Sequence, residues 1–265
     1  MKKRPLIFLL CLFAYHAYAQ DNISTPQQNN EESLKQLPVL WMQTAAEYRA
    51  LCYQAFNTAQ WRLESLLKKK KKTAHWAIIT DLDETILDNS YEEARRIKTN
   101  KDYNNADWNH WVNQSAATEV PGASKFLQWV HQKGITVFYI SNRDSSQVMA
   151  TLINLKKLQL PDADTAHMLF LTNTSSKEAR RQTVMSRYNV VMLFGDNLND
   201  FTYLFEKKDI ATRKTETDKA RAEWGNKFIV LPNSTYGEWE NALYEYNRKL
   251  TPTEKDAKRK ALLKE

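Results

Sequence analysis

Five short apolar runs alternate with segments of helical periodicity, and this alternation constrains the fold of the 265-residue chain more than any other feature. The runs are rich in β-branched and aromatic residues and occupy residues 77–80, 135–140, 168–171, 190–194 and 228–231. Continuous apolar runs of this length are typical of strands buried on both faces of a parallel sheet. Helices that join parallel strands form right-handed crossovers, so the pattern predicts an α/β fold with a doubly wound parallel sheet.

Two further segments extend this sheet domain. Apolar residues recur every three or four positions from Trp41 to Leu66, which predicts one long amphipathic helix from Pro38 to about Lys70. Residues 90–120 have no strand signal and hold several aromatic residues among polar ones. Because this segment follows the end of the first strand, we expect it to form a helical cap over that end of the sheet.

The N-terminus has the three regions of a secretory signal peptide. Basic residues 2–4 precede an apolar run that is too short for a stable membrane span, and Ala17 and Ala19 form a small-x-small cleavage site. We therefore predict a signal peptide over residues 1–19 and an exported protein, located in the periplasm or at the outer surface.

The remaining chain reads as one domain with extensions. An Asn/Gln/Ser-rich stretch predicts a flexible lead-in over residues 20–36. The domain proper is expected over residues 37–265, with the cap insertion at about residues 90–120. Residues 251–265 are Lys-rich and lack aromatic side chains, so we expect a peripheral helix or tail there.

The two cysteines bear on export and anchoring. Cys11 follows Leu10, whereas a bacterial lipobox has a small residue before its cysteine, so we do not expect a lipid anchor. Cys52 lies on the helical apolar stripe and is expected in the core. An exported protein without disulfides fits a bacterial periplasm or surface.

The charge is mildly basic. Removing residues 1–19 takes three positive charges from the formal net charge of +7, which leaves +4. This excess favours anionic substrates, but the Lys68–Lys72 run has no interleaved aromatic residues and does not indicate binding to a nucleic acid polymer. The sequence does not fix the oligomeric state, and a homodimer is left open.

Acidic residues follow two of the apolar runs. Asp81 and Asp83 come directly after the first run, and Asp196 and Asp200 come directly after the fourth. With the expected strand order 3-2-1-4-5, the ends of these two strands are neighbours at the point where the strand order reverses. Four carboxylates in one cleft repel one another unless a cation lies among them, and hard oxygen ligands with open water positions suit Mg²⁺.

Polar and basic residues follow the other strands. Ser141 and Asn142 end the second strand, and Lys177 opens the helix after the third. Each of these residues alone has an ordinary structural explanation as a cap or a surface side chain. Their placement at successive strand ends favours a role in holding a phosphoryl group beside a metal ion.

These residues resemble the four motifs of the haloacid-dehalogenase-like (HAD) superfamily. The motifs are D-L-D-E-T at Asp81–Thr85, S-N-R at Ser141–Arg143, the Lys177 position and G-D-N-L-N-D at Gly195–Asp200. Further segments are similar to the bacterial class C acid phosphatases, also called acid phosphatase/5′-nucleotidases: L-D-N-S at Leu87–Ser90, D-W-N-x-W-V at Asp107–Val112, V-P-G-A at Val120–Ala123 and L-P-N-x-x-Y-G-x-W at Leu231–Trp239. The similarity covers nearly all of the mature chain. The similarity ends at the export signal: well-known members are outer-membrane lipoproteins, whereas this sequence lacks their lipobox.

The resemblance implies a two-step hydrolysis at acidic pH. Asp81 would attack phosphorus and form an aspartyl-phosphate, which divides one difficult displacement into two. Asp83 would protonate the leaving oxygen and then deprotonate the hydrolytic water. Mg²⁺ would be held by the Asp81 carboxylate, the backbone carbonyl of Asp83 and Asp196, with Asp200 nearby or acting through water.

Ligand contacts follow from the same resemblance. Ser141 and Lys177 would hold phosphate oxygens. Trp108, Trp111 and Tyr236 are the candidates for gripping a nucleobase or aryl leaving group. The implied substrates are small phosphate monoesters, including nucleoside 5′-monophosphates.

Two alternatives remain open at the level of sequence. One is a phosphatase for phosphoproteins, because D-L-D-E-T also occurs in phosphatases of phosphoserine tails. The other is a non-catalytic module that accepts phosphate on Asp81, although such a module has little need for Asp83.

Overall fold

The computed structural model describes residues 31–69 and 75–265 of the chain. Its centre is a five-stranded parallel sheet in the order β5-β4-β1-β6-β7. Numbered among the sheet strands alone, this order is 3-2-1-4-5, so the predicted doubly wound topology is confirmed. The predicted signal peptide and most of the predicted lead-in lie outside the described residues.

The sheet strands match the five apolar runs. They are β1 (Trp76–Thr80), β4 (Thr136–Asp144), β5 (Met168–Leu171), β6 (Asn189–Gly195) and β7 (Phe228–Val230). All residues of β1 are buried, which explains why its sequence is apolar from Trp76 to Ile79 instead of alternating.

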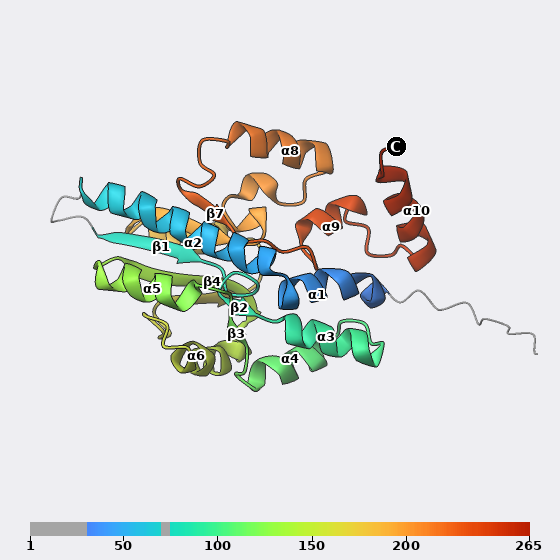
Figure 1. Ribbon diagram of the computed structural model, residues 1–265, viewed down its shortest axis with the longest axis horizontal. Coiled ribbons are helices and arrows are strands. Elements are labelled where there is room, and N and C mark those ends of the chain that lie inside the picture. The colour runs from blue at the N-terminus through green and yellow to red at the C-terminus, as the bar shows by residue number, and fades with distance from the viewer. Residues whose placement is uncertain (1–30, 70–74) are drawn as a thin grey trace, which may run out of the picture.

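Helices cover both faces of the sheet. Ile78 packs in one core cluster with side chains of α2 (Ala46–Leu67), α5 (Ala123–Gln132) and α6 (Val148–Lys157). Its neighbours Ala77 and Ile79 point to the opposite face, as the two-residue period of a strand requires. There they join a second cluster with α7 (Glu178–Met185). Figure 1 shows α2 and α5 running side by side along one face.

The N-terminal helix differs from the prediction. The expected continuous helix is divided at Ala45, whose extended backbone separates α1 (Gln36–Thr44) from α2. This bend lets α1 pack against α3, while α2 packs against α5 and β7. Residues 31–36, expected in the flexible lead-in, are helical: η1 (Glu31–Lys35) leads directly into α1.

The segment after β1 forms two helices beside the carboxyl end of the sheet (Figure 1). They are α3 (Ser90–Thr99) and α4 (Asn105–Asn113). Contrary to the expectation of no strand in this segment, β3 (Thr118–Glu119) pairs antiparallel with β2 (Leu87–Asp88). This short ribbon ties the two ends of the insertion together.

The remaining elements are short. They are η2 (Ser145–Gln147), η3 (Leu198–Asp200), η4 (Tyr203–Phe205), α8 (Ile210–Lys219), α9 (Glu238–Leu243) and α10 (Pro252–Leu262). The C-terminal helix α10 is peripheral, because none of its residues is buried. Arg259 of α10 forms an ion pair with Glu31 at 3.0 Å. Among the described residues, no helix is long and apolar enough to cross a membrane.

Candidate active site

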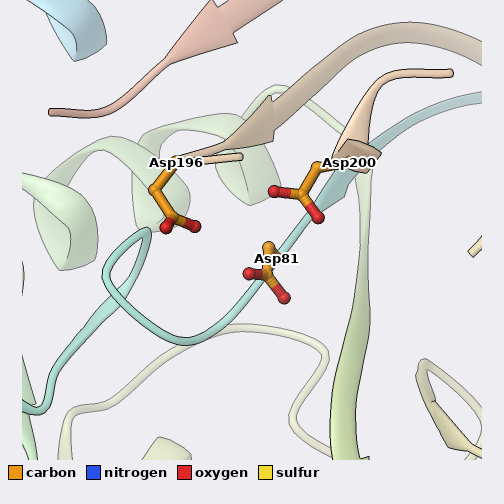
Figure 2. A group of neighbouring side chains, drawn as sticks. All are labelled: Asp81, Asp196 and Asp200. Carbon is orange, nitrogen blue, oxygen red and sulfur yellow. The ribbon is translucent and has the colours of Figure 1, made fainter. Parts of the chain in front are cut away.

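Three acidic side chains meet at the carboxyl end of the sheet. Asp81 follows β1, while Asp196 and Asp200 follow β6, the strand that pairs with β1. Ligand oxygens of the three carboxylates lie within 4.8 Å of one another. Figure 2 shows the three carboxyl groups turned toward a common space. The structure thus brings together the acidic residues that follow the first and fourth sheet strands.

A buried lysine lies between two of these carboxylates. The Nζ atom of Lys177, at the start of α7, is 2.5 Å from Oδ1 of Asp81 and 2.6 Å from Oδ1 of Asp200. Burial alone would lower the pKa of Lys177, but the Asp200 and Asp81 carboxylates outweigh it and raise that pKa. The ammonium group therefore stays charged and offsets part of the negative charge of the site.

The acidic groups retain an excess of negative charge. Burial raises the pKa of Asp81 well above its ordinary value against the opposing effect of Lys177, and Asp200 and Asp196 raise it further. Burial and the nearby Asp200 raise the pKa of Asp196 to about 7. Crowded carboxylates behave in this way when one cation is too few to balance them.

Neighbouring polar groups fix the orientation of the carboxylates. Asp196 accepts hydrogen bonds from Thr85 Oγ1 at 3.2 Å and from Asn233 Nδ2 at 2.8 Å. Oδ2 of Asp200 accepts from the backbone N–H of Asn197 at 3.1 Å. Such partners are typical of carboxylates that are held ready to bind a metal.

The fourth predicted carboxylate, that of Asp83, has a different place. It lines the same cavity, but it is not part of the group formed by Asp81, Asp196 and Asp200. Its side chain forms an ion pair with Arg143 at 2.7 Å. All four acidic residues thus line one cavity, while the closely spaced group found among the described residues comprises Asp81, Asp196 and Asp200, and Asp83 pairs with Arg143.

The two predicted phosphate ligands that follow β4 differ in exposure. Ser141 is fully buried and does not line the cavity; its Oγ accepts a hydrogen bond from the backbone N–H of Arg143 at 3.1 Å. Asn142 lines the cavity and is held by Arg180, whose Nη2 donates to Asn142 Oδ1 at 2.6 Å. Asn142 is thus the member of the pair with access to a ligand.

The acidic residues form part of the wall of a cavity of about 430 Å³. Trp108 and Tyr236, two of the three aromatic residues suggested to contact a leaving group, line it together with Tyr103. Trp111 does not line it: its indole N–H donates instead to Asn89 Oδ1 at 2.8 Å. Trp111 thus acts on the site through Asn89.

A tight turn carries another buried acid into the cavity wall. Leu82 O accepts the backbone N–H groups of residues 85–87, and Glu84 takes the left-handed conformation with φ 54°. The Glu84 carboxylate accepts from the backbone N–H of Asn89 at 2.9 Å and from the hydroxyl of Tyr236. This contact fixes Tyr236 at the cavity wall.

Sequence reasoning gave no role to several residues that complete the site. Arg143 lies in the S-N-R motif, and Asn233 follows the last strand at the same sheet edge, so strand-end position was an available signal for both. Glu84 and Asn89 also lie in quoted motifs, D-L-D-E-T and L-D-N-S, but their contacts depend on side-chain directions within the turn after β1 and could not be read from the motifs.

Comparisons with known proteins agree with this geometry. The family model described as "HAD superfamily, subfamily IIIB (Acid phosphatase)" matches residues 8–239. The chain belongs to this family. Two solved structures of the class C acid phosphatase from Bacillus anthracis, one with tungstate bound, are each 41% identical to it. Each match has a TM-score of 0.84 and covers 88% of this chain and 98% of the other.

Family membership makes the chain a phosphoric monoester hydrolase of the acid phosphatase type. The resemblance stated from the motifs is confirmed, and so is the enzyme class. Members of this superfamily typically use a divalent metal, and the phosphatase has the acidic trio that such a metal needs. Small-molecule phosphate esters fit the enzyme as substrates.

Proposed function

We propose that the phosphatase is an exported, Mg²⁺-dependent enzyme that hydrolyses phosphate monoesters, including nucleoside 5′-monophosphates, through an aspartyl-phosphate at Asp81. The observation that carries this proposal is the grouping of Asp81, Asp196 and Asp200 around a common space, with Lys177 bound to two of them. The class C acid phosphatase with tungstate bound supports it, because tungstate is a tetrahedral oxyanion like phosphate.

The acidic trio fits Mg²⁺ on its own chemistry. It offers hard carboxylate oxygens, and burial together with the neighbouring carboxylates raises the pKa values of Asp81 and Asp196, so a bound cation would favour their ionised forms. Asp81, Asp196 and Asp200 would hold the ion, together with the backbone carbonyl of Asp83. When bound, Mg²⁺ supplies positive charge that lets the phosphoryl group approach a carboxylate.

The first step uses Asp81 and Asp83. A carboxylate oxygen of Asp81 forms a bond to phosphorus while the bond from phosphorus to the ester oxygen breaks. Asp83 gives a proton to the leaving oxygen, so that an alcohol and not an alkoxide departs. Lys177 and Asn142 lie beside Asp81 in the same cavity and can bind the phosphoryl oxygens during the transfer.

The second step clears the enzyme. Asp83, now ionised, takes a proton from water, and the water oxygen attacks phosphorus of the aspartyl-phosphate. The bond between phosphorus and the Asp81 oxygen breaks, which releases phosphate and restores both carboxyl groups. Because Asp83 serves both steps, its orientation matters twice in each cycle.

Aromatic side chains near the cavity suit a planar leaving group. Trp108, Tyr103 and Tyr236 all line it, and the ring of Trp108 lies 6.5 Å from that of Tyr103. Stacking on such rings stabilises nucleobases without requiring a particular base. A cavity of about 430 Å³ accommodates a nucleoside monophosphate more readily than a folded phosphoprotein, so we favour small esters over the phosphoprotein alternative.

Export rests on the sequence alone. The basic and apolar N-terminus with its small-residue cleavage site supports a secreted enzyme, and Leu10 before Cys11 argues against a lipid anchor. Mass measurement of the mature protein after expression in a bacterium tests this, with an N-terminus at Gln20 expected.

A panel of phosphomonoesters tests the catalytic proposal. Wild-type enzyme should hydrolyse nucleoside 5′-monophosphates and aryl phosphates with added Mg²⁺, most rapidly at acidic pH, and should lose activity when a chelator removes the ion. Asp81→Asn should abolish turnover, because an amide is a poor nucleophile. Full activity in excess chelator would refute the metal, and substantial activity of Asp81→Asn would refute the nucleophile.

A further inference from the structure

A guanidinium group binds Asp83 through two nitrogen atoms. Nη2 of Arg143 donates to Oδ1 of Asp83 at 2.7 Å, and Nε donates at 3.0 Å to Oδ1 and 3.2 Å to Oδ2. Planar contacts of this kind fix direction as well as distance. Arg143 therefore determines where the Asp83 carboxylate points.

A second residue, Asn89, binds the same carboxylate oxygen as Arg143 and also accepts a hydrogen bond from Arg143 Nη2 at 3.4 Å. Nδ2 of Asn89 donates to Oδ1 of Asp83 at 2.8 Å. Asn89 is itself oriented, because its Oδ1 accepts from Trp111 Nε1 at 2.8 Å. Trp111 fixes which end of the Asn89 amide faces Asp83, since only the carbonyl oxygen can accept from an indole N–H.

Arg143 has few other partners. Its side chain is 1% exposed, and Asp83 is its one carboxylate partner among residues 31–69 and 75–265. Nη1 donates to Oγ1 of buried Thr151 at 3.0 Å, and the guanidinium lies 5.6 Å from the ring centre of Trp108. A charge buried in this way does not move freely, so it can hold Asp83 in one place.

The two carboxylate oxygens of Asp83 differ in the hydrogen bonds that they accept. Within the described part of the chain, Oδ1 receives close hydrogen bonds from Arg143 and Asn89, whereas Oδ2 has only the longer contacts with Arg143 Nε at 3.2 Å and Ser141 Oγ at 3.4 Å. The oxygen with fewer donors is the one that retains a lone pair for a proton. Oδ2 is thus the atom equipped to exchange a proton with the substrate.

We propose that Arg143, with Asn89 and Trp111 behind it, is the positioning set for the acid/base carboxylate, and that Asp83 transfers its proton through Oδ2. This inference rests on the proposed function, since it assumes that Asp83 protonates the leaving oxygen. Arg143 is a positioning residue here, because it acts through Asp83 and is not assigned a contact with the ester.

Comparing substrates with good and poor leaving groups distinguishes a loss of Asp83 positioning from a general loss of enzyme activity. The 5′-oxygen of a nucleoside is a poor leaving group and needs a proton from the enzyme, whereas 4-nitrophenolate leaves readily without one. General acid catalysis contributes about 10²–10⁴-fold. Arg143→Lys keeps the charge but loses the paired contacts, so kcat/KM for a nucleoside 5′-monophosphate should fall about 100-fold, against about fivefold or less for 4-nitrophenyl phosphate.

Trp111→Phe gives a milder variant that keeps an aromatic ring in the same packing. It removes only the N–H donor to Asn89, and it should lower kcat/KM for the nucleotide about 3–10-fold with little change for the aryl ester. Arg213→Lys is the matched control, because Arg213 is also buried but donates to Phe205 O at 2.7 Å and Asn199 Oδ1 at 3.2 Å instead of to Asp83. Any loss in this control should be equal for the two substrates.

Combining variants provides an independent test. In an Asp83→Asn background, Arg143→Lys should cause little further loss of kcat/KM for the nucleoside 5′-monophosphate, although it costs about 100-fold in the wild-type background, because residues that act as one unit are not additive. Equal losses of the two substrates in Arg143→Lys and Trp111→Phe, or an additive loss in the double variant, would overturn the inference. An active Asp81→Asn enzyme would overturn the proposed function instead, so the two failures are distinguishable.

Discussion

The position of Asp200 depends on the absence of a single methyl group. A Cβ atom at Gly195 would overlap Cβ and Oδ2 of Asp200, although the backbone at Gly195 is not in the left-handed region. Glycine is thus required there for space and not for conformation. The missing Cβ leaves the space that the Asp200 side chain occupies while it binds Lys177 at 2.6 Å, so the last strand residue of β6 helps to shape the acidic trio.

Gly195→Ala should therefore reduce catalytic activity strongly while the protein remains folded. We expect kcat/KM to fall at least about 100-fold and the free energy of unfolding to fall by about 1–3 kcal/mol, the usual cost of overpacking. Gly134→Ala is the control: its Cβ would meet open space, and only its φ of +71° opposes substitution. That variant should lose about 1 kcal/mol of stability and keep its kcat. Unaltered activity in Gly195→Ala would contradict this role.

Asn233 offers a way to weaken the metal site without removing a ligand. It donates to Oδ2 of Asp196 at 2.8 Å. Asn233→Ala should raise the Mg²⁺ concentration needed for half-maximal activity about 10–100-fold, while excess Mg²⁺ restores most of kcat. Titration of activity with Mg²⁺ measures this, and Asn247→Ala, at an exposed loop asparagine, serves as control. An unshifted titration would show that Asn233 does not orient the ligand.

At the scale of elements, a buried charged cluster joins the N-terminal helices to the insertion. Arg96 of α3 binds Glu32 of η1 at 2.8 Å and Glu92 at 2.6 Å. Glu93 is less well paired: both its carboxylate oxygens are buried without a hydrogen bond among the described residues, and Arg96 is 3.5 Å away. Burial raises the pKa of Glu93 to about 7 against the opposing charges of Lys35 and Arg96.

Because of this raised pKa, Glu93 makes the folded protein more stable at acidic pH than at neutral pH. The folded state keeps the Glu93 proton up to about pH 7, while the unfolded state releases it near the ordinary value of 4.5. Stability from this group is fully present below pH 4.5 and is lost as pH rises toward 7. Between these limits the loss is on the order of 3 kcal/mol.

Glu93→Gln removes the titrating group and keeps its shape. Denaturant unfolding from pH 4.5 to 8 should show that wild type loses stability relative to this variant, by on the order of 3 kcal/mol over the range. Comparing the two proteins cancels the titration of the other acidic groups. Parallel stability curves would mean that Glu93 ionises normally in the folded protein.

The elements also show what sequence could and could not predict. The five strands were predictable because burial on both faces leaves continuous apolar runs, as in Ala77–Ile79. The bend at Ala45 was not, because no Gly or Pro marks it and packing of α1 on α3 decides it. The helical turn at Glu31–Lys35 was missed for a similar reason: its polar composition hides the burial of Glu32 beside Arg96.

At the scale of the whole molecule, the site is a consequence of strand order. Because β1 and β6 are neighbours, residues more than a hundred positions apart, such as Thr85 and Asp196, come into hydrogen-bonding contact. Topology therefore made the acidic trio predictable from strand ends. It could not predict the direction of Asp83 or Trp111, because these depend on Arg143 and Asn89, whose side chains meet only in the folded protein.

The peripheral position of α10 gives a prediction at this scale. Its described contacts with the rest of the chain are solvent-accessible ones, such as Arg259 with Glu31 and with the Tyr244 hydroxyl. Ending the chain after Leu250 should cost about 1 kcal/mol of stability and change kcat/KM by less than about twofold. Steady-state kinetics and thermal unfolding measure both. A large loss of activity would mean that α10 supports the cavity from a distance.

In each catalytic cycle, Asp81 is expected to form a covalent aspartyl-phosphate beside the acidic trio, which water then hydrolyses. Rapid acid quenching during turnover of a radiolabelled phosphate monoester, followed by peptide mapping, tests it most directly. We predict that label appears on the peptide containing Asp81, requires added Mg²⁺, persists longer in Asp83→Asn and is absent in Asp81→Asn. Label on another residue, or turnover in single-cycle experiments with no labelled peptide at any time, would contradict the account.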